Sequence, residues 1–288
     1  MAGPWKFRTG DDAAFARPDL DDSSWETLRV PGGWGRQGHA GYAGFGWYRL
    51  AVSVDEVARR SPTSLALTMG SVDSAYELYA GGQRLGGVGA LPPDARLEYD
   101  RHATFVIPRE AVDDRGRLVL AVRVYKAPIT TRWGGGLVEG EYLLGPLDTL
   151  TRRESVSDIP ELTLVVVFVL AGLYHMQLYR RRPGCASTSG SGPWPSRPGP
   201  TRFLRTQWRF ALPFDFATLK DLEHLMLYVG AATFVQFVWP LLGRPLGRGL
   251  RAFQAANVLG GLLVVLPGLR LNLLLLPGGR SGSRPRSR

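Results

Sequence analysis

The sequence predicts an all-β sandwich domain over residues 1–150, followed by α-helical transmembrane segments. Short runs of alternating apolar and polar residues fill the first 150 positions, separated by Gly, Pro and Asp, as is typical of β-strands. Residues 162–179 then form a run without formal charge that is long enough to cross a bilayer as a helix. Charge divides the chain in the same way: residues 1–150 carry 17 basic and 19 acidic side chains, and residues 151–288 carry 18 and 6.

Five strand-length runs stand out in the first domain. They are "WYRLAVSV" (47–54), "SLALTMG" (64–70), "AYELYAGGQRLG" (75–86), "ATFVIP" (103–108) and "RLVLAVRVY" (117–125). Within the third run, Gly81 and Gly82 can adopt positive φ without strain and therefore predict a hairpin turn. Only "PREAV" (108–112) indicates a helical turn.

The first predicted span lies within residues 159–182. Tyr174 and Tyr179 lie near its carboxyl end, and Arg180–Arg182 follow directly. Because basic residues concentrate on the cytoplasmic side, this end is expected in the cytoplasm and the β-domain outside it. The predicted location is therefore the inner cell membrane, crossed several times.

Residues 206–277 are expected to form a partial membrane region, with spans near 222–242 and 252–276 and a basic disordered tail over 278–288. The basic loop 244–251 should also be cytoplasmic, yet one span alone separates it from Arg180–Arg182. The intervening segment 183–205 is rich in Gly, Pro, Ser and Arg. It is either a flexible linker or a span lost through a reading-frame shift, in which case the chain is a fragment.

A family resemblance rests on "WKFRTGDD", "DLDDSSWETLRVPGGW", "GFGWYRLAVSV", "GSVDSAYELYAGGQRLG" and "GRLVLAVRVY". Over residues 3–146 these stretches resemble a galactose-binding-like jelly roll, similar to the sugar-binding domain of family 2 glycoside hydrolases. A jelly roll followed by spans resembles the bacterial seven-transmembrane receptors with diverse intracellular signalling modules. "RFLRTQWRFALPFDFATLKDLEHLMLYVGAATFVQFVWPLLGRPLGR" resembles their membrane region, particularly in versions that end in a protein phosphatase 2C-type serine phosphatase. The chain departs from them by lacking further spans and an output domain.

No catalytic residue, metal site or cofactor site is expected. Two acidic clusters, Asp11–Asp12 and Asp19–Asp22, could supply calcium ligands, but Asp, Ser and Gly at this density more often form turns and caps. His39 and His102 are isolated in the sequence. In the resembling hydrolases the catalytic residues lie in a separate barrel, so the chain is expected not to be an enzyme.

Ligand binding remains as the predicted activity of the first domain. Trp34, Tyr42, Arg132 and Trp133 fall in glycine-rich loops, where aromatic rings can stack on a sugar, and Asp73 is their candidate polar partner. For the loop tryptophans, packing beneath the loop is the alternative.

The predicted function is a membrane receptor fragment that senses a small molecule, such as a carbohydrate, and relays to a cytoplasmic signalling domain or partner. The lipid bilayer is its other expected partner, and no nucleic acid is expected because the basic residues flank apolar runs. The alternatives are an anchored carbohydrate-binding module without signalling and an enzyme, either a glycosidase remnant or a fragment of a membrane-bound serine/threonine phosphatase.

Overall fold

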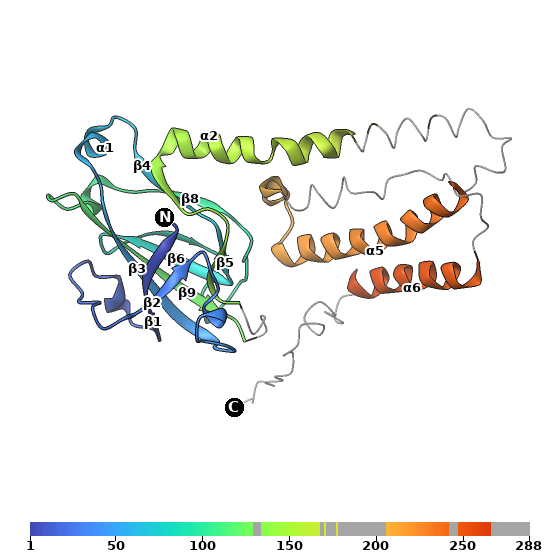
Figure 1. Ribbon diagram of the computed structural model, residues 1–288, viewed down its shortest axis with the longest axis horizontal. Coiled ribbons are helices and arrows are strands. Elements are labelled where there is room, and N and C mark those ends of the chain that lie inside the picture. The colour runs from blue at the N-terminus through green and yellow to red at the C-terminus, as the bar shows by residue number, and fades with distance from the viewer. Residues whose placement is uncertain (129–133, 168–169, 171–176, 178–205, 242–246, 266–288) are drawn as a thin grey trace. The chain divides into compact units, whose positions relative to one another are not determined.

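A computed structural model describes residues 1–128, 134–167, 170, 177, 206–241 and 247–265 (Figure 1). By its internal contacts the chain divides near residue 154. One compact unit begins at Met1 and runs to Glu154, and a second covers Ser155–Leu275.

A six-stranded antiparallel sheet forms one layer of the first unit. Its order is β2-β1-β3-β9-β6-β7. The strands are β1 (Gly3–Thr9), β2 (Glu26–Val30), β3 (Gly44–Ser53), β6 (Ala75–Ala80), β7 (Gln83–Val88) and β9 (Arg117–Lys126). The central pair β3 and β9 is continuous, from Gly44 opposite Lys126 to Ser53 opposite Arg117.

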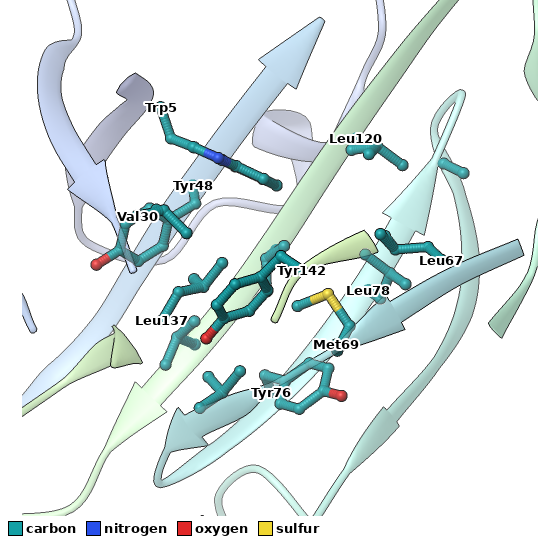
Figure 2. Close-up of a cluster of buried hydrophobic side chains, with 14 of the residues drawn as sticks. Trp5, Val30, Tyr48, Leu67, Met69, Tyr76, Leu78, Leu120, Leu137 and Tyr142 are labelled. Carbon is teal, nitrogen blue, oxygen red and sulfur yellow. The ribbon is translucent and has the colours of Figure 1, made fainter. Parts of the chain in front are cut away.

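Two smaller sheets form the other layer. One contains β11 (Leu143–Pro146), β4 (Leu65–Met69) and β8 (Ala103–Val106), and the other pairs β10 (Gly136–Glu139) with β5 (Ser71–Asp73). Their inward side chains meet those of the six-stranded sheet in one hydrophobic core (Figure 2). Trp5, Tyr48, Leu78 and Leu120 enter this core from the large sheet, and Leu67, Met69 and Leu137 from the smaller ones. The alternation in the sequence thus reflects the two faces of each strand.

A second, smaller cluster covers the outer face of the six-stranded sheet. Trp25 and Trp47 are buried there with Ala16 from the short helix η1 (Ala13–Ala16). Arg49, 1% exposed, holds this covering segment: its Nε donates to Asp22 Oδ2 at 2.9 Å and its Nη1 donates to the carbonyl of Phe15 at 2.6 Å. The segment between β1 and β2 therefore packs against the outer face of the sheet.

The turns follow the local sequence. Gly81 and Gly82 connect β6 to β7 with φ of +55° and +86°, which confirms the predicted hairpin. The predicted helical turn is confirmed as η3 (Arg109–Ala111). The remaining short elements of this unit are η2 (Trp34–Arg36) and α1 (Glu56–Arg60).

The described part of the second unit is helical. Helix α2 (Leu147–Ser157) crosses the boundary between the units, and η5 (Gln207–Ala211), α5 (Phe216–Leu241) and α6 (Arg248–Val265) follow. Helices α5 and α6 pack closely because α6 presents glycines to α5: a Cβ on Gly260 would lie 2.8 Å from Tyr228 Cε1. An ion pair also forms in this unit, between Arg209, 3% exposed, and Glu223.

The predicted transmembrane segments are corrected here. Among the described residues, no helix combines the length and apolarity needed to cross a bilayer. The span predicted at 222–242 falls mostly in α5, whose first turns carry Lys220, Asp221 and Glu223, and the span at 252–276 falls on α6, described only to Val265. Much of 159–182, all of 183–205 and the tail 278–288 lie outside the described residues. The predicted fold class, a jelly roll followed by transmembrane helices, was therefore wrong: the structure shows a β-rich domain followed by helices, and no described helix meets the requirements for crossing a bilayer.

Candidate functional site at the glycine loops

Two glycine-rich loops pair at one end of the β-domain, and we call this end the glycine-loop site. It comprises residues 32–35 and 134–137 together with Asp73 and Lys126. The backbone amide of Gly32 donates to the carbonyl of Leu137 at 2.7 Å, and that of Trp34 donates to Gly135 at 2.9 Å. A third bond, from the Gly35 amide to the Gly134 carbonyl, measures 3.3 Å. Two loops that are far apart in the sequence are thereby fixed to each other.

The peptide group between Gly134 and Gly135 is held at both of its polar atoms. Its carbonyl oxygen accepts from Lys126 Nζ at 3.3 Å, and its amide donates to Asp73 Oδ2 at 2.8 Å. The other carboxylate oxygen of Asp73 accepts from the Ser74 hydroxyl at 2.7 Å. A cation thus faces the negative end of this peptide dipole and an anion faces the positive end, an electrostatically favourable arrangement.

Lys126 occupies an unusual position for a lysine. It is 2% exposed and follows the inward residues Leu118, Leu120, Val122 and Val124 along β9. Burial lowers the pKa of Lys126, and the charge of Asp73 opposes that shift. A buried ammonium is costly unless polar groups surround it, so its position at this end of the strand requires a reason.

Glycine is required where the second loop passes the core. Gly135 and Gly136 have φ of +97° and +85°, in the left-handed region that favours glycine. A Cβ on Gly135 would lie 2.3 Å from Trp34 Nε1, and one on Gly136 would lie 2.0 Å from the Tyr48 hydroxyl. Glycine is therefore needed in the "GGG" run at 134–136 because the backbone there passes close to two aromatic side chains.

The structure does not bring the five predicted ligand residues together as one exposed set. Trp34 is fully buried against Phe7 and Tyr48, so its ring packs beneath the loop, as the alternative interpretation held. Tyr42 is half-buried, lies 5.8 Å from the Trp34 ring, and donates its hydroxyl to the Phe45 carbonyl at 2.7 Å. Asp73 belongs to the clamped peptide described above. Arg132 and Trp133 lie outside the described residues, directly before Gly134.

Sequence reasoning missed Lys126. Its signal was present in the sequence: a charged residue at an inward position, immediately after four apolar inward residues of an alternating strand. His39, dismissed as isolated, pairs with Glu26 at 2.9 Å and contacts the Phe7 ring beside this loop end.

Carboxylates of the two acidic clusters accept hydrogen bonds from nearby backbone amides and so stabilise local turns. Asp12 caps η1 by accepting from the Ala14 amide at 2.8 Å, and Asp21 accepts from the Ser23 amide at 2.9 Å. Hydrogen bonds from Ser23 lower the pKa of Asp21. Within the described residues, no group of three or more His, Cys, Asp or Glu side chains is placed to hold a metal ion.

A shallow hollow lies at the opposite end of the strands. Its volume is about 220 Å³, and its lining includes Val54, Arg59, Leu65, Ile107 and Arg109. It touches none of the residues of the glycine-loop site.

Comparison with known proteins relates the chain to glycosidases. A protein of Formosa agariphila described as "Putative beta-glucuronidase" is 34% identical over 97 residues, which cover 28% of this chain and 9% of that protein. No protein-family model matches the sequence. The chain thus spans less than a tenth of the length of this curated relative.

Solved structures with similarity to the chain come from the same group of enzymes. A beta-glycosidase from Bacteroides vulgatus is 21% identical, with a TM-score of 0.41 over 51% of this chain and 20% of its own. A Bacteroides uniformis beta-glucuronidase is 22% identical, with a TM-score of 0.39 over 50% of this chain and 18% of its own.

These findings overturn the receptor hypothesis. The curated relative is a glycosidase by description, and no described helix can cross a bilayer, so neither the seven-transmembrane receptor nor the membrane phosphatase is supported. The same findings correct the anchored binding module, the lipid bilayer as a partner and the inner-membrane location. The prediction that the chain is not an enzyme is contradicted too, because the curated relative is described as a β-glucuronidase.

Proposed function

We propose that residues 1–150 are the β-domain of a glycosidase of the β-glucuronidase type, and that its glycine-loop site binds the sugar of the substrate. The observation that carries this proposal is the 34% identity over 97 residues to the Formosa agariphila protein. Hydrolysis by the whole protein, and the β-glucuronide as its substrate, are parts of the proposal.

The glycine-loop site supports sugar binding by its chemistry. Two paired loops, a clamped peptide and half-buried Asp73 and Tyr42 gather polar groups at a rigid end of the domain. Arg132 and Trp133 adjoin this fixed backbone in the sequence. We propose that Trp133 stacks on the sugar ring and that Arg132 binds its oxygens, since aromatic rings and guanidinium groups commonly do so in such sites. Trp34, being buried, supports the loop from below.

The test is a calorimetric titration of the full chain with p-nitrophenyl β-D-glucuronide, which measures binding. Release of p-nitrophenol, measured in parallel, reports hydrolysis. We expect saturable binding that weakens at least about tenfold in Trp133→Ala, taking as a guide the contribution, on the order of 1–3 kcal/mol, that stacking on an aromatic side chain makes for nucleic-acid bases. Trp208→Ala, at a tryptophan that is 53% exposed in the second unit, is the matched control and should bind as the unaltered chain does. Equal affinity in both variants would show that Trp133 does not contact the sugar, and no binding to the unaltered chain would reject the proposed function.

A further inference from the structure

We propose that Gln37 closes the edge of the six-stranded sheet at β2, so that a strand from a second copy of the chain does not add there. Edge strands need such protection because their outward backbone groups can pair with another chain. The proposal concerns self-association and does not depend on the proposed function of the glycine-loop site.

Strand β2 presents the backbone groups of Arg29 and Thr27 away from the sheet. It is the last strand on one side of the sheet, where its neighbour is β1. Arg29 stands opposite Pro4, which has no amide hydrogen to donate across the ladder. The direction of bonding alternates along an antiparallel strand, so Arg29 and Thr27, two residues apart, both turn their amide and carbonyl groups outward.

The side-chain amide of Gln37 takes the place of an added strand at Arg29. Its Oε1 accepts from the Arg29 amide at 2.7 Å, and its Nε2 donates to the Arg29 carbonyl at 3.0 Å. A residue of an added antiparallel strand would exchange the same pair of bonds. Nε2 also donates to the Gly32 carbonyl at 3.1 Å, so turning the amide over would set its oxygen against two carbonyl groups. The orientation of the Gln37 amide is therefore fixed.

The loop that carries Gln37 follows the edge of β2. A Cβ on Gly32 would lie 2.9 Å from the Arg29 carbonyl oxygen and 3.0 Å from Gln37 Nε2, so a larger residue would force these groups apart. Two residues after Gln37, His39 Nε2 lies 2.9 Å from Glu26 Oε1, at the other end of β2. The loop therefore runs antiparallel to β2, as an added strand would.

The part of this edge that Gln37 leaves open is short. Among the described residues, none bonds the outward amide or carbonyl of Thr27. A single residue can exchange only one pair of backbone bonds with an incoming strand. Without the Gln37 amide, Arg29 would offer a second pair beside it. The edge is thus unsuitable for strand addition only while Gln37 occupies Arg29.

The opposite edge of the sheet is protected in another way. Strand β7 contains an extra residue against β6, because Gly86 stands opposite Leu78 while Arg84 stands opposite Tyr79. Such a bulge twists an edge strand and interrupts its row of outward groups. Strand β2 shows no register shift, so its regular edge is the one that requires a cover.

The experiment compares Gln37→Ala with the control Gln83→Ala in the full chain. Gln83 is an exposed glutamine at the start of β7. Self-association is measured by sedimentation velocity at increasing protein concentration. Exchange of the Arg29 amide hydrogen is measured at residue resolution by mass spectrometry at the lowest and the highest concentration. The Leu28 amide, which points towards β1, reports whether β2 stays in the sheet.

We expect Gln37→Ala to self-associate at least about tenfold more strongly than the unaltered chain, because Arg29 of each copy regains two groups for pairing. At the lowest concentration its Arg29 amide should exchange at least about tenfold faster, and at the highest concentration the protection should return. Adding Thr27→Pro, which removes the neighbouring outward amide but no bond to β1, should abolish the gain in association. Gln83→Ala should match the unaltered chain in both readouts.

Faster exchange at Arg29 without stronger association would overturn the inference, because the open edge would then attract no second copy. Association that persists after Thr27→Pro would also overturn it, since the contact would then form elsewhere. Unchanged exchange at Arg29 would show that Gln37 does not close the edge. Should Gln37→Ala lose the protection of Leu28, Gln37→Leu, which keeps most of the side-chain volume without the amide, decides by the same two readouts.

Discussion

The buried Lys126 should give the protein a measurable dependence on alkaline pH. Burial lowers the pKa of Lys126 from its ordinary value of 10.5. Between the folded and unfolded pKa values the unfolded chain binds more protons, so the contribution of Lys126 to stability rises with pH in that window. We expect the stability of the unaltered chain relative to Lys126→Met to increase as pH rises towards 10.5, as measured by urea unfolding. A constant or falling difference would contradict the burial of a charged amine there.

At Gly136, even a substitution by alanine should strongly lower the free energy of unfolding. Gly136→Ala would force a left-handed backbone on alanine and bring its Cβ to 2.0 Å from the Tyr48 hydroxyl. We expect a loss of about 2–4 kcal/mol in the free energy of unfolding. Adding Tyr48→Phe removes the hydroxyl and should recover part of that loss.

The control for this substitution is Gly38→Ala, whose φ of +106° imposes strain but whose Cβ would meet no atom within 4 Å. It should cost less than Gly136→Ala. Equal losses at the two positions, in chemical denaturation of the full chain, would show that the Tyr48 contact adds nothing.

At the scale of elements, the outer face of the six-stranded sheet is stabilised by an ion-pair network across strands. Arg123 on β9 bonds Asp11 and, at 3.1 Å, Glu77 on β6, while Arg84 on β7 bonds Glu77 at 2.8 Å. Burial acts to raise the pKa of Glu77, but the hydrogen bonds from Tyr79 and Arg123 outweigh it and the pKa is lowered. The carboxylate of Glu77 on β6 therefore links the two neighbouring strands, β7 and β9.

This network predicts sensitivity to acid. Because the folded pKa of Glu77 lies below its ordinary value of 4.5, its contribution is complete above pH 4.5 and is lost as pH falls through the folded pKa. We expect the stability difference between the unaltered chain and Glu77→Gln to shrink as pH falls from 6 to 3. Glu56→Gln, at a pair whose Glu56 side chain is 61% exposed, is the control and should differ little at either pH. A difference for Glu77→Gln that stays constant with pH would reject the network's role.

The sequence predicts a strand correctly where apolar and polar residues alternate clearly along its whole length. Strand β9 alternates along its length, and its inward residues lie in the core as the alternation implies. Strand β5 has three residues, two of them polar, and is too short for any period to show. It forms because β10 pairs with it, with Gly136 opposite Asp73. The apolar run at 222–242 was misjudged because its length and apolarity do not show that α5 begins earlier, with charged first turns. Glu223 in those turns pairs with Arg209 of η5.

The candidate site was predictable only in part. The glycine runs marked the correct loops, and Asp73 was singled out as their polar partner. The contacts of Lys126 and Asp73 with the 134–135 peptide depend on how the strands and loops pack in space. No local sequence pattern predicts that packing. Trp34 could equally have faced outward in a glycine-rich loop; its burial follows from the pairing of 32–35 with 134–137.

At the scale of the whole molecule, the division near residue 150 stays a prediction that proteolysis can test. Arg152 and Arg153 are exposed on α2, close to where the contacts separate the two units. We expect brief trypsin treatment of the full chain to leave a resistant fragment that ends near these residues. Degradation without such a fragment would mean that the β-domain depends on the rest of the chain for its stability.

The central claim, a sugar site at the glycine loops of a glycosidase β-domain, is tested most directly by a crystal structure of the full chain soaked with methyl β-D-glucuronide. The account predicts sugar density beside residues 134–137, within reach of Asp73 and the residues that precede Gly134. Density confined to the hollow lined by Val54 and Ile107, or no density at a concentration that saturates binding in solution, would contradict it.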